Sequence, residues 1–265
     1  MKIAIIGAGN MGGAIARGIA SGSIVAAKDL CVSDVSELNL QGLQAFCGEI
    51  KTTTDNKSAV ADADIILLAV KPWLVETVAK EIKDSFDPKK QILVSIAAGV
   101  NLETLQGLFA QMLAPAPTCF RIIPNTAIDV KQSVNTIATA NSTPEQNELI
   151  LRIFNELGQS YLVPESQLNA LMALSSCGIA YAFRYIRAAM EGGVEMGIAP
   201  AMAKSVVAQT LRGAIDLLEQ NQSHPEVEID KVTTPGGITI KGLNRMEAEG
   251  FTNAVIEGLK ASLIK

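Results

Sequence analysis

A glycine-rich loop directly after an apolar run is the feature that most constrains what this chain can fold into. The run Ile3-Ala4-Ile5-Ile6 is followed by Gly7, Gly9 and Gly12 in the spacing GxGxxG, and a helical pattern through Ala14–Ala20 comes next. Gly7 permits a tight turn, Gly9 lets the backbone approach a pyrophosphate, and Gly12 lets the helix pack closely on the strand. The loop therefore predicts dinucleotide binding by Ile6, Gly7, Ala8, Gly9, Asn10, Met11 and Gly12.

Short β-rich runs continue to alternate with helical segments until about residue 163. Each run precedes a turn and then an amphipathic segment, which is typical of βαβ units and a parallel sheet. We therefore expect residues 1–163 to form a dinucleotide-binding Rossmann domain with a doubly wound parallel sheet. The predicted strands are Lys2–Ile6, Leu30–Ser33, Ile65–Val70, Ile92–Ile96, Cys119–Ile123, Ser133–Thr139 and Ser160–Val163, with a helix over Pro144–Leu157 between the last two.

After Pro164 the β-rich runs stop and the pattern becomes helical, which predicts a second, all-helical domain over residues 164–265. Gly192-Gly193 and Gly197 are expected to interrupt or end its first helix. The predicted helices are Glu165–Gly197, Pro200–Gln220 and Gly237 to the C-terminus, with a polar loop over Asn221–Ile229.

The stretch Leu168–Phe183 is the most apolar part of a chain whose residues are 48% hydrophobic. It is shorter than the roughly 20 apolar residues that a membrane span needs, and it carries Asn169, Ser175 and Ser176. We expect a buried helix here.

Composition and charge exclude several classes of partner. A net charge of −5 leaves no basic surface for nucleic acid, so small molecules and copies of the same chain are the expected partners. The apolar run before Gly7 is too short for a signal peptide, and we expect a cytoplasmic protein. Cys31, Cys47, Cys119 and Cys177 form no CxxC pair, so buried small residues are expected rather than a metal site or disulfides.

Asp34 lies at the end of the second predicted strand, where the dinucleotide fingerprint places an acidic residue roughly 20 positions after the glycine loop. A carboxylate here can accept hydrogen bonds from the adenosine ribose and repels a 2′-phosphate. NADH is therefore favoured over NADPH. Lys28 or Lys51 remain candidates for a phosphate contact, and Asp34 or Ser36 could instead cap the next helix.

Three further strands end in small residues or proline, at the edge where open parallel sheets bind their ligands. These ends are Ala69–Pro72, Ser95–Gly99 and Arg121–Asn125. Turn formation alone explains the small residues and proline at each of these ends taken singly. Together they predict a cofactor trough lined by Ala69, Val70, Lys71, Pro72, Ile96, Ala97, Ala98 and Asn125.

The C-terminal half offers a hydroxyl-rich turn rather than an obvious acid or base. The one histidine, His224, is most simply a loop residue, and Tyr181 and Tyr185 suit a core or interface as well as catalysis. The turn Thr233–Thr239 precedes the last helices, and its N–H groups and hydroxyls form a nest for a carboxylate, although helix capping is the alternative. A hydroxyl donor without a strong base suits reduction of an imine, whose nitrogen can arrive protonated.

These features together resemble the pyrroline-5-carboxylate reductase family over nearly the whole chain. The resemblance implies reduction of L-1-pyrroline-5-carboxylate to L-proline, the last step of proline biosynthesis, by NADPH or NADH. It also implies homodimers built by intertwined C-terminal helices and often assembled into a decamer. The motifs that carry it are Gly7–Gly12, Ala69–Pro72, Ile96–Gly99, Pro124-Asn125, Glu191–Val194, His224-Pro225 and, most specifically, Pro235–Leu243.

The resemblance also implies roles for particular residues. Thr239 would be the catalytic residue, bonded to the ring nitrogen, and Glu165 would line the same pocket. Asn56 would lie near the adenosine ribose, while Lys71 and Ala97-Ala98 would border the nicotinamide. Positioning would carry most of the catalysis, and a site shared by two protomers would make dimerisation necessary for activity. The substrate carboxylate would be held by Thr234, Gly236, Gly237, Ile238 and Thr239.

Some residues depart from the family pattern. Where the family reads S-G-S-G-P-A-Y, Ser176, Cys177 and Ile179 replace glycine, serine and proline, so altered packing or an altered pocket is expected. Asp34 stands where many family members carry an uncharged polar residue. This difference argues against the family's usual preference for NADPH in this chain. One rival is a β-hydroxyacid dehydrogenase-type reductase of another imine or small acid, although its central-helix lysine is missing here. Another is a non-catalytic dinucleotide-binding protein.

Overall fold

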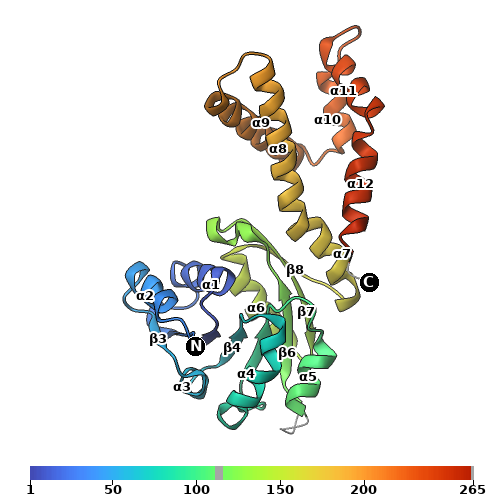
Figure 1. The fold of residues 1–265 in the computed structure, drawn as a ribbon. Coiled ribbons are helices and arrows are strands. Elements are labelled where there is room, and N and C mark those ends of the chain that lie inside the picture. The colour runs from blue at the N-terminus through green and yellow to red at the C-terminus, as the bar shows by residue number, and fades with distance from the viewer. Residues whose placement is uncertain (111–115, 264–265) are drawn as a thin grey trace. The chain divides into compact units, whose positions relative to one another are not determined.

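The computed structural model describes residues 1–110 and 116–263 (Figure 1). The chain forms two compact units, Met1–Ser176 and Cys177–Lys265. The division falls later along the chain than the change of pattern at Pro164, because Leu168 is fully buried among the apolar side chains of the first unit. The first unit therefore includes the first turns of the region predicted to be helical.

One eight-stranded sheet forms the centre of the first unit, in the order β3-β2-β1-β4-β5-β6-β7-β8. Neighbouring strands are parallel except β6 and β7, so the predicted doubly wound sheet is confirmed with one antiparallel pairing. Every predicted strand is present. The prediction omits β3, a three-residue polar strand at the sheet edge that carries no apolar run. The strands are β1 (Ile3–Ile6), β2 (Leu30–Ser33), β3 (Lys51–Thr53), β4 (Ile65–Leu68), β5 (Ile92–Ser95), β6 (Thr118–Ile123), β7 (Ser133–Ala140) and β8 (Gly158–Leu162).

The central strands supply side chains to two separate cores. In β1, Ile3 and Ile5 belong to one apolar cluster, whereas Ala4 and Ile6 belong to the other. Because successive side chains of a strand point to opposite faces, helices must cover both faces of the sheet. One face packs against α1 (Asn10–Ala20), α2 (Glu37–Phe46) and α6 (Pro144–Asn155), and the other against α3 (Asn56–Ala61), α4 (Val75–Ile82) and α5 (Leu102–Ala110).

A π-helical turn interrupts the helix predicted over Glu165–Gly197. The chain passes from α7 (Leu168–Met172) through this turn at Ala173–Cys177 into α8 (Gly178–Glu195). The prediction of a single regular helix is therefore wrong, because a π turn inserts a residue that apolar periodicity does not reveal. Short 3₁₀ turns lie at Ala27–Asp29, Pro72–Leu74, Lys83–Ser85, Thr126–Val130 and Glu165–Gln167.

The described part of the second unit contains helices and no strand (Figure 1, yellow to red). α8 and α9 pack so closely that a Cβ at Gly193 would lie 3.3 Å from the Cβ of Ala203. Tyr185 of α8 meets Phe251 edge to face at 6.4 Å, and the Tyr181 hydroxyl donates to the carbonyl of Gly258 at 3.2 Å. Both tyrosines therefore tie α12 to α8. The remaining helices are α9 (Pro200–Asn221), α10 (Pro225–Val232), α11 (Ile238–Ala248) and α12 (Phe251–Ala261).

The polar loop predicted over Asn221–Ile229 is wrong, because α10 begins within it. His224 is the N-cap residue, and its Nδ1 accepts a hydrogen bond from the N–H of Glu226 at 3.3 Å. Pro225 occupies the first helical position, where its fixed φ suits a helix start. The polar composition of this segment hides the helical pattern, although the N-cap residue His224 and the first helical residue Pro225 can be recognised in the sequence.

Glycines with positive φ end or break helices in this unit. Gly197 has a φ of +88° just after α8, as predicted, whereas Gly192 and Gly193 lie inside that helix. Gly250 has a φ of +82° and separates α11 from α12. The helical structure expected from Gly237 onwards is therefore present as two helices, because Gly250 adopts the left-handed conformation.

The second unit buries very little apolar surface. Among its described residues, Ala203 is the one buried apolar side chain, and Phe183 of α8 is 64% exposed. The buried helix expected over Leu168–Phe183 is therefore wrong for the single chain, and such apolar faces need a covering partner. None of the described helices combines the length and apolar character of a membrane span.

Candidate active site

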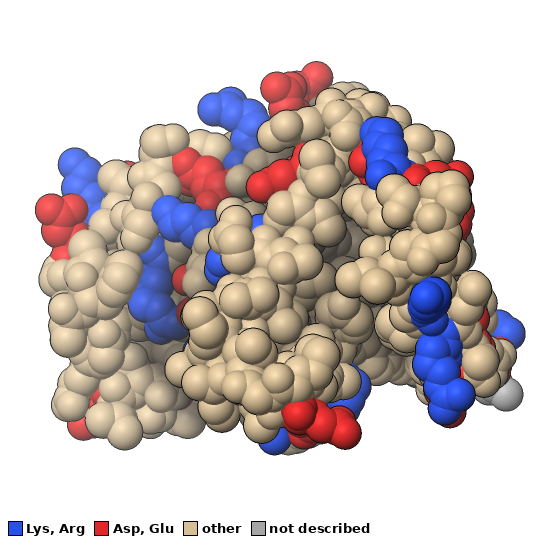
Figure 2. Space-filling model, turned by 90° about the horizontal axis from the view of Figure 1, so that it is seen from above, with Lys and Arg blue, Asp and Glu red and all other residues tan. Residues whose placement is uncertain are grey.

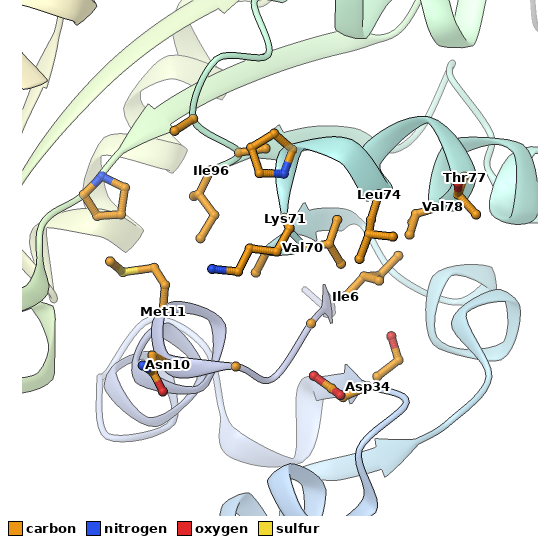
Figure 3. Close-up of a pocket in the computed structure, with 18 of the residues that line it drawn as sticks. Ile6, Asn10, Met11, Asp34, Val70, Lys71, Leu74, Thr77, Val78 and Ile96 are labelled. Carbon is orange, nitrogen blue, oxygen red and sulfur yellow. The ribbon is translucent and has the colours of Figure 1, made fainter.

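A pocket of about 860 Å³ lies at the carboxyl ends of β1, β2, β4, β5 and β6 (Figure 3). Open parallel sheets bind ligands at this edge, where the loops after the strands bring together residues distant in sequence. The trough predicted from the strand ends is therefore present. Of the predicted cofactor residues, the pocket brings together Ile6, Gly7, Gly9, Asn10, Met11, Asp34, Asn56, Ala69, Val70, Lys71, Pro72, Ile96, Ala97 and Ala98.

Backbone geometry explains the glycines of the loop. Gly7 has a φ of +105°, and a Cβ on it would lie 2.7 Å from the carbonyl oxygen of Ala69. A Cβ on Gly12 would lie 2.0 Å from the carbonyl oxygen of Gly7, so glycine lets α1 lie close to the loop and to Ala69 at the end of β4. Gly9 differs, since a Cβ there would meet no described atom within 4 Å. Because Gly9 lines the pocket, this open space is available to a ligand.

The start of α1 is suited to an anion. The helix begins at Asn10 with Gly9 as its N-cap, and no side chain bonds its first N–H groups. Such N–H groups carry the positive end of the helix dipole and bind phosphate. Together with the space beside Gly9, they fit the pyrophosphate of a dinucleotide.

The carboxylate of Asp34 is bonded to the glycine loop. Its Oδ2 accepts a hydrogen bond from the N–H of Ala8 at 2.5 Å, and its Oδ1 accepts one from the N–H of Ser36 at 2.7 Å. Ser36, and not Asp34, caps α2, by accepting from the N–H of Asn39 at 3.4 Å. Each carboxylate oxygen can accept a further hydrogen bond, so Asp34 is available to a ribose hydroxyl. Ala8 does not line the pocket, and its contact with Asp34 shapes the loop.

Two other predicted cofactor residues lie outside the pocket lining, Gly12 and Asn125. Gly12 is buried in α1 against the loop. Asn125 is buried, and its Oδ1 caps the following 3₁₀ turn by accepting from the N–H of Ala127 at 3.1 Å. Both residues therefore shape the walls of the site.

Several lining residues belong to no motif in the sequence. In Figure 3, Asp34, Thr77 and Val78 lie towards one end of the pocket, and Asn10 and Met11 towards the other. The position of Val35 directly after Asp34 is a signal that sequence reasoning could have used. The sequence of α4 does not indicate that this helix lines the pocket, because its amphipathic pattern is common to surface helices in general. The additional residues are Ser33, Val35, Leu74, Thr77, Val78, Glu81, Ile123, Pro124, Met172 and Ser176.

Charges in the pocket are unevenly placed. Asp34 and Glu81 are acidic, and Lys71 is the one basic residue among the described residues that line it. Figure 3 shows the Lys71 side chain extending into the pocket towards Met11. Elsewhere, charges of both signs are scattered between uncharged areas on the face that Figure 2 shows.

Glu165 forms an ion pair and does not line this pocket. Its Oε1 is 3.0 Å from Nη1 of Arg121 and accepts a hydrogen bond from the N–H of Leu102 at 2.8 Å. The Arg121 side chain is only 8% exposed, so its charge requires this carboxylate. Glu165 thereby ties the segment before α7 to β6 and the start of α5.

Met172, the last residue of α7, and Ser176, in the π-helical turn, both line the pocket. The Ser176 hydroxyl donates to the carbonyl of Pro124 at 3.1 Å, and the Ser175 hydroxyl donates to the carbonyl of Leu171 at 2.7 Å. Ser176, one of the departures from the family pattern, therefore links the π turn to the end of β6.

The hydroxyl-rich turn lies in the second unit, at the start of α11. The N–H of Gly237 donates to the carbonyl of Thr234 at 2.9 Å, and Gly236 has a φ of +72°, which suits a type II turn with Pro235 before it. α11 begins without a side-chain cap, and the hydroxyls of Thr234 and Thr239 have no partner within the described part of the chain. These groups can bind a carboxylate.

The expectation of buried cysteines is confirmed for Cys119, whereas Cys31, Cys47 and Cys177 are partly exposed. Burial raises the pKa of the Cys119 thiol to about 12, and burial raises that of Cys31 despite the opposing charge of Lys51. Both thiols stay protonated and act as packing residues. Within residues 1–110 and 116–263, no group of histidine, cysteine, aspartate and glutamate side chains is arranged to hold a metal.

Comparisons with known sequences cover both units. Residues 165–265 match a family model described as pyrroline-5-carboxylate reductase dimerisation, and residues 2–99 match one described as NADP oxidoreductase, coenzyme F420-dependent. The chain is 37% identical to the pyrroline-5-carboxylate reductase of Methanosarcina acetivorans, over 98% of this chain and 96% of that protein. It is 32% identical to the Arabidopsis thaliana pyrroline-5-carboxylate reductase, over 98% and 94%.

Solved structures show the same likeness. The pyrroline-5-carboxylate reductase of Coxiella burnetii has a TM-score of 0.88 at 29% identity, covering 99% of this chain and 96% of that one. The pyrroline carboxylate reductase of Plasmodium falciparum, solved with NADP bound, has a TM-score of 0.86 at 25% identity and covers 99% and 95%.

Proposed function

The chain belongs to the pyrroline-5-carboxylate reductase family, and we propose how its residues carry out the family's reaction. It is an NAD(P)H-dependent oxidoreductase that reduces L-1-pyrroline-5-carboxylate to L-proline in proline biosynthesis. The observation that carries the residue assignment is the 860 Å³ pocket, where the glycine loop, an uncapped helix start and Asp34 meet.

The pocket fits a nicotinamide dinucleotide in one direction. The N–H groups at the start of α1 and the open space beside Gly9 suit the pyrophosphate, and Asp34 suits the adenosine ribose. Val35, which follows Asp34 in the sequence, and Leu74 also line the pocket and offer apolar contacts for the adenine. The nicotinamide then lies towards Ala97 and the end of β5. When bound, the cofactor supplies the hydride from this ring.

The turn before α11 holds the substrate. The N–H groups of Ile238 and Thr239, with Gly236 and Gly237 shaping the backbone, bind the carboxylate, and the Thr234 hydroxyl adds a donor. The Thr239 hydroxyl hydrogen-bonds the ring nitrogen and orients the imine carbon for reduction. Catalysis rests mainly on this positioning, because the imine nitrogen arrives protonated.

One carboxylate oxygen of Glu165 remains available for a contact with the substrate. Its Oε1 is committed to Arg121 and Leu102, so any substrate contact is made through Oε2. The Glu165 side chain is 30% exposed, which allows that contact. We therefore propose that Glu165 contacts the substrate.

The helical unit forms the homodimer. Its apolar side chains, among them Phe183, Met202 and Ile238, are exposed in the single chain, and they require a second copy to cover them. A decamer of such dimers is the larger assembly we propose. Since the substrate site then includes both protomers, activity requires the dimer. The four free cysteines suit a reducing compartment, so we place the protein in the cytoplasm.

NADH is the favoured cofactor. Asp34 offers a ribose hydroxyl two acceptor oxygens and opposes a 2′-phosphate by charge. The Plasmodium relative has NADP bound, so both cofactors must be compared directly.

A parallel assay with NADH and NADPH tests the reaction and the cofactor together. Pyrroline-5-carboxylate should accelerate oxidation of both, and NADH more strongly. Thr239→Ala should lower turnover roughly 10- to 100-fold, the value of one hydrogen bond to a charged group, without changing NADH affinity. Thr239→Ser keeps the hydroxyl and serves as the matched control.

Each part of the proposal can fail separately. If pyrroline-5-carboxylate accelerates neither oxidation, the reaction itself is wrong for this chain, and the rival reductase or binding protein gains support. Wild-type turnover in Thr239→Ala would remove the catalytic role of Thr239 alone. An unchanged cofactor ratio in Asp34→Ser would remove only the role of Asp34 in cofactor choice.

A further inference from the structure

A chain of hydrogen bonds runs along the pocket wall beside Asp34. The Ser33 hydroxyl donates to Oδ1 of Asn56 at 2.7 Å, and Nδ2 of Asn56 donates to Oε2 of Glu81 at 2.9 Å. The three residues come from the end of β2, the start of α3 and the last turn of α4, and all three line the pocket.

The two ends of this chain determine how the Asn56 amide is oriented. A carboxylate such as that of Glu81 can only accept hydrogen bonds, so the NH₂ group of Asn56 must face it. The amide oxygen then faces Ser33, which is fully buried and donates its proton to it. Glu81 therefore occupies a donor of Asn56 that a phosphate oxygen could otherwise use.

Glu81 also adds a second carboxylate to the lining that includes Asp34, and Ser33, at the other end of its hydrogen-bond chain, directly precedes Asp34. A ribose 2′-phosphate bound at Asp34 would carry nearly two negative charges and would be repelled by both carboxylates. Lys80, the neighbour of Glu81 in α4, is paired with Glu76 at 2.6 Å, and Lys71 is the one basic residue among the described residues that line the pocket.

We propose that Glu81, acting with Asn56, is a specificity-determining residue that favours a free ribose 2′-hydroxyl over a 2′-phosphate, and so NADH over NADPH. The inference rests on the proposed orientation of the dinucleotide, with its adenosine ribose at Asp34. It goes beyond that proposal, because Glu81 belongs to a different element from the glycine fingerprint and α2. It also makes cofactor choice depend on two carboxylates.

Binding of NAD⁺ and NADP⁺ to the full chain provides a test that does not depend on turnover. The dissociation constants can be followed through fluorescence of Trp73, the chain's single tryptophan, which adjoins the lining residues Pro72 and Leu74. Glu81→Gln removes the charge and keeps an acceptor for Asn56. Glu103→Gln removes an exposed carboxylate of α5 outside the pocket lining, and it is the matched control.

Glu81→Gln should tighten NADP⁺ binding about tenfold while NAD⁺ binding changes less than about twofold, and the difference should shrink at high salt. Glu103→Gln should change neither constant. Equal effects of Glu81→Gln on both dinucleotides, or no effect, would overturn the role of Glu81.

The Asp34→Ser variant separates the two proposals. A shift of the NADP⁺ to NAD⁺ ratio in Asp34→Ser but not in Glu81→Gln would leave the proposed orientation intact and reject the role of Glu81. If wild-type protein binds neither dinucleotide, the proposed function fails, and the role of Glu81 fails with it.

Discussion

Replacing three neighbouring glycines by alanine, one at a time, should separate folding from cofactor binding. Gly12→Ala places a Cβ 2.0 Å from the carbonyl oxygen of Gly7 and 2.8 Å from the Cβ of Ala69. These are backbone and short side-chain atoms, which cannot move aside without a substantial cost in free energy. Overpacking of this kind costs about 1–3 kcal/mol, which lowers Tm by roughly 2–12 °C for a unit of this size.

Gly9→Ala should have the opposite effect. Its φ of −64° suits alanine, and its Cβ meets no described atom within 4 Å, so Tm should change by only a few degrees. The added methyl group occupies the space proposed for the pyrophosphate. Loss of one hydrogen bond to a phosphate, worth about 1.5–3 kcal/mol, should weaken NADH binding roughly 10- to 100-fold.

Gly13→Ala is the matched control for both variants. Its Cβ would lie 3.2 Å from the carbonyl oxygen of Ala8 and 3.3 Å from the flexible end of Arg17. The small strain is offset by the gain of about 0.5–1 kcal/mol for alanine over glycine inside a helix. Calorimetric Tm and NADH titration on the same samples provide the test. NADH binding like wild type in Gly9→Ala, or an unchanged Tm in Gly12→Ala, would refute the reasoning.

Three further predictions concern stability and assembly. Glu165→Gln leaves the Arg121 guanidinium, 8% exposed, without its counter-charge, so the free energy of unfolding should fall by about 2–4 kcal/mol in denaturant titration. An unchanged midpoint would show that the pair contributes nothing. Hydrogen bonds from Lys231, then Ser223, hold the pKa of Glu228 at about 2, below its ordinary 4.5. The Tm advantage of wild type over Glu228→Gln should therefore be full above pH 4.5 and disappear as the pH falls to about 2. A constant advantage across that range would contradict this sign. Phe183→Glu should yield monomers in light scattering and abolish turnover while preserving NADH binding, and an intact active dimer would argue against an interface on α8.

Local chemistry in the sequence predicted the dinucleotide-binding half well. Strands such as β1 are recognisable because, in a doubly wound sheet, both faces are buried and the residues are continuously apolar. The end of a parallel strand is also the place where ligands bind, so Asp34, Lys71 and Ala97 could be assigned to the pocket before their contacts were known. The turn at Thr234–Thr239 is similarly local, since Pro235 and Gly236 specify its backbone.

Contacts between segments that are distant in the sequence could not be predicted from the sequence. Glu81 lies on an ordinary amphipathic helix, and only its hydrogen bond to Asn56 shows that it belongs to the cofactor site. Asn125 and Glu165 have residue types that suit a ligand, but the structure engages one as a cap and the other with Arg121.

The amino-acid sequence by itself therefore determined the strand–loop–helix unit at Gly7–Gly12, because φ values and close backbone approaches depend on the residues within that short segment. The tertiary structure alone decided which side chains share the adenosine end of the pocket. It also decided that the apolar helices of the second unit lie exposed in the single chain. Burial and charge pairing are properties of neighbours in space, and those neighbours are far apart along the chain.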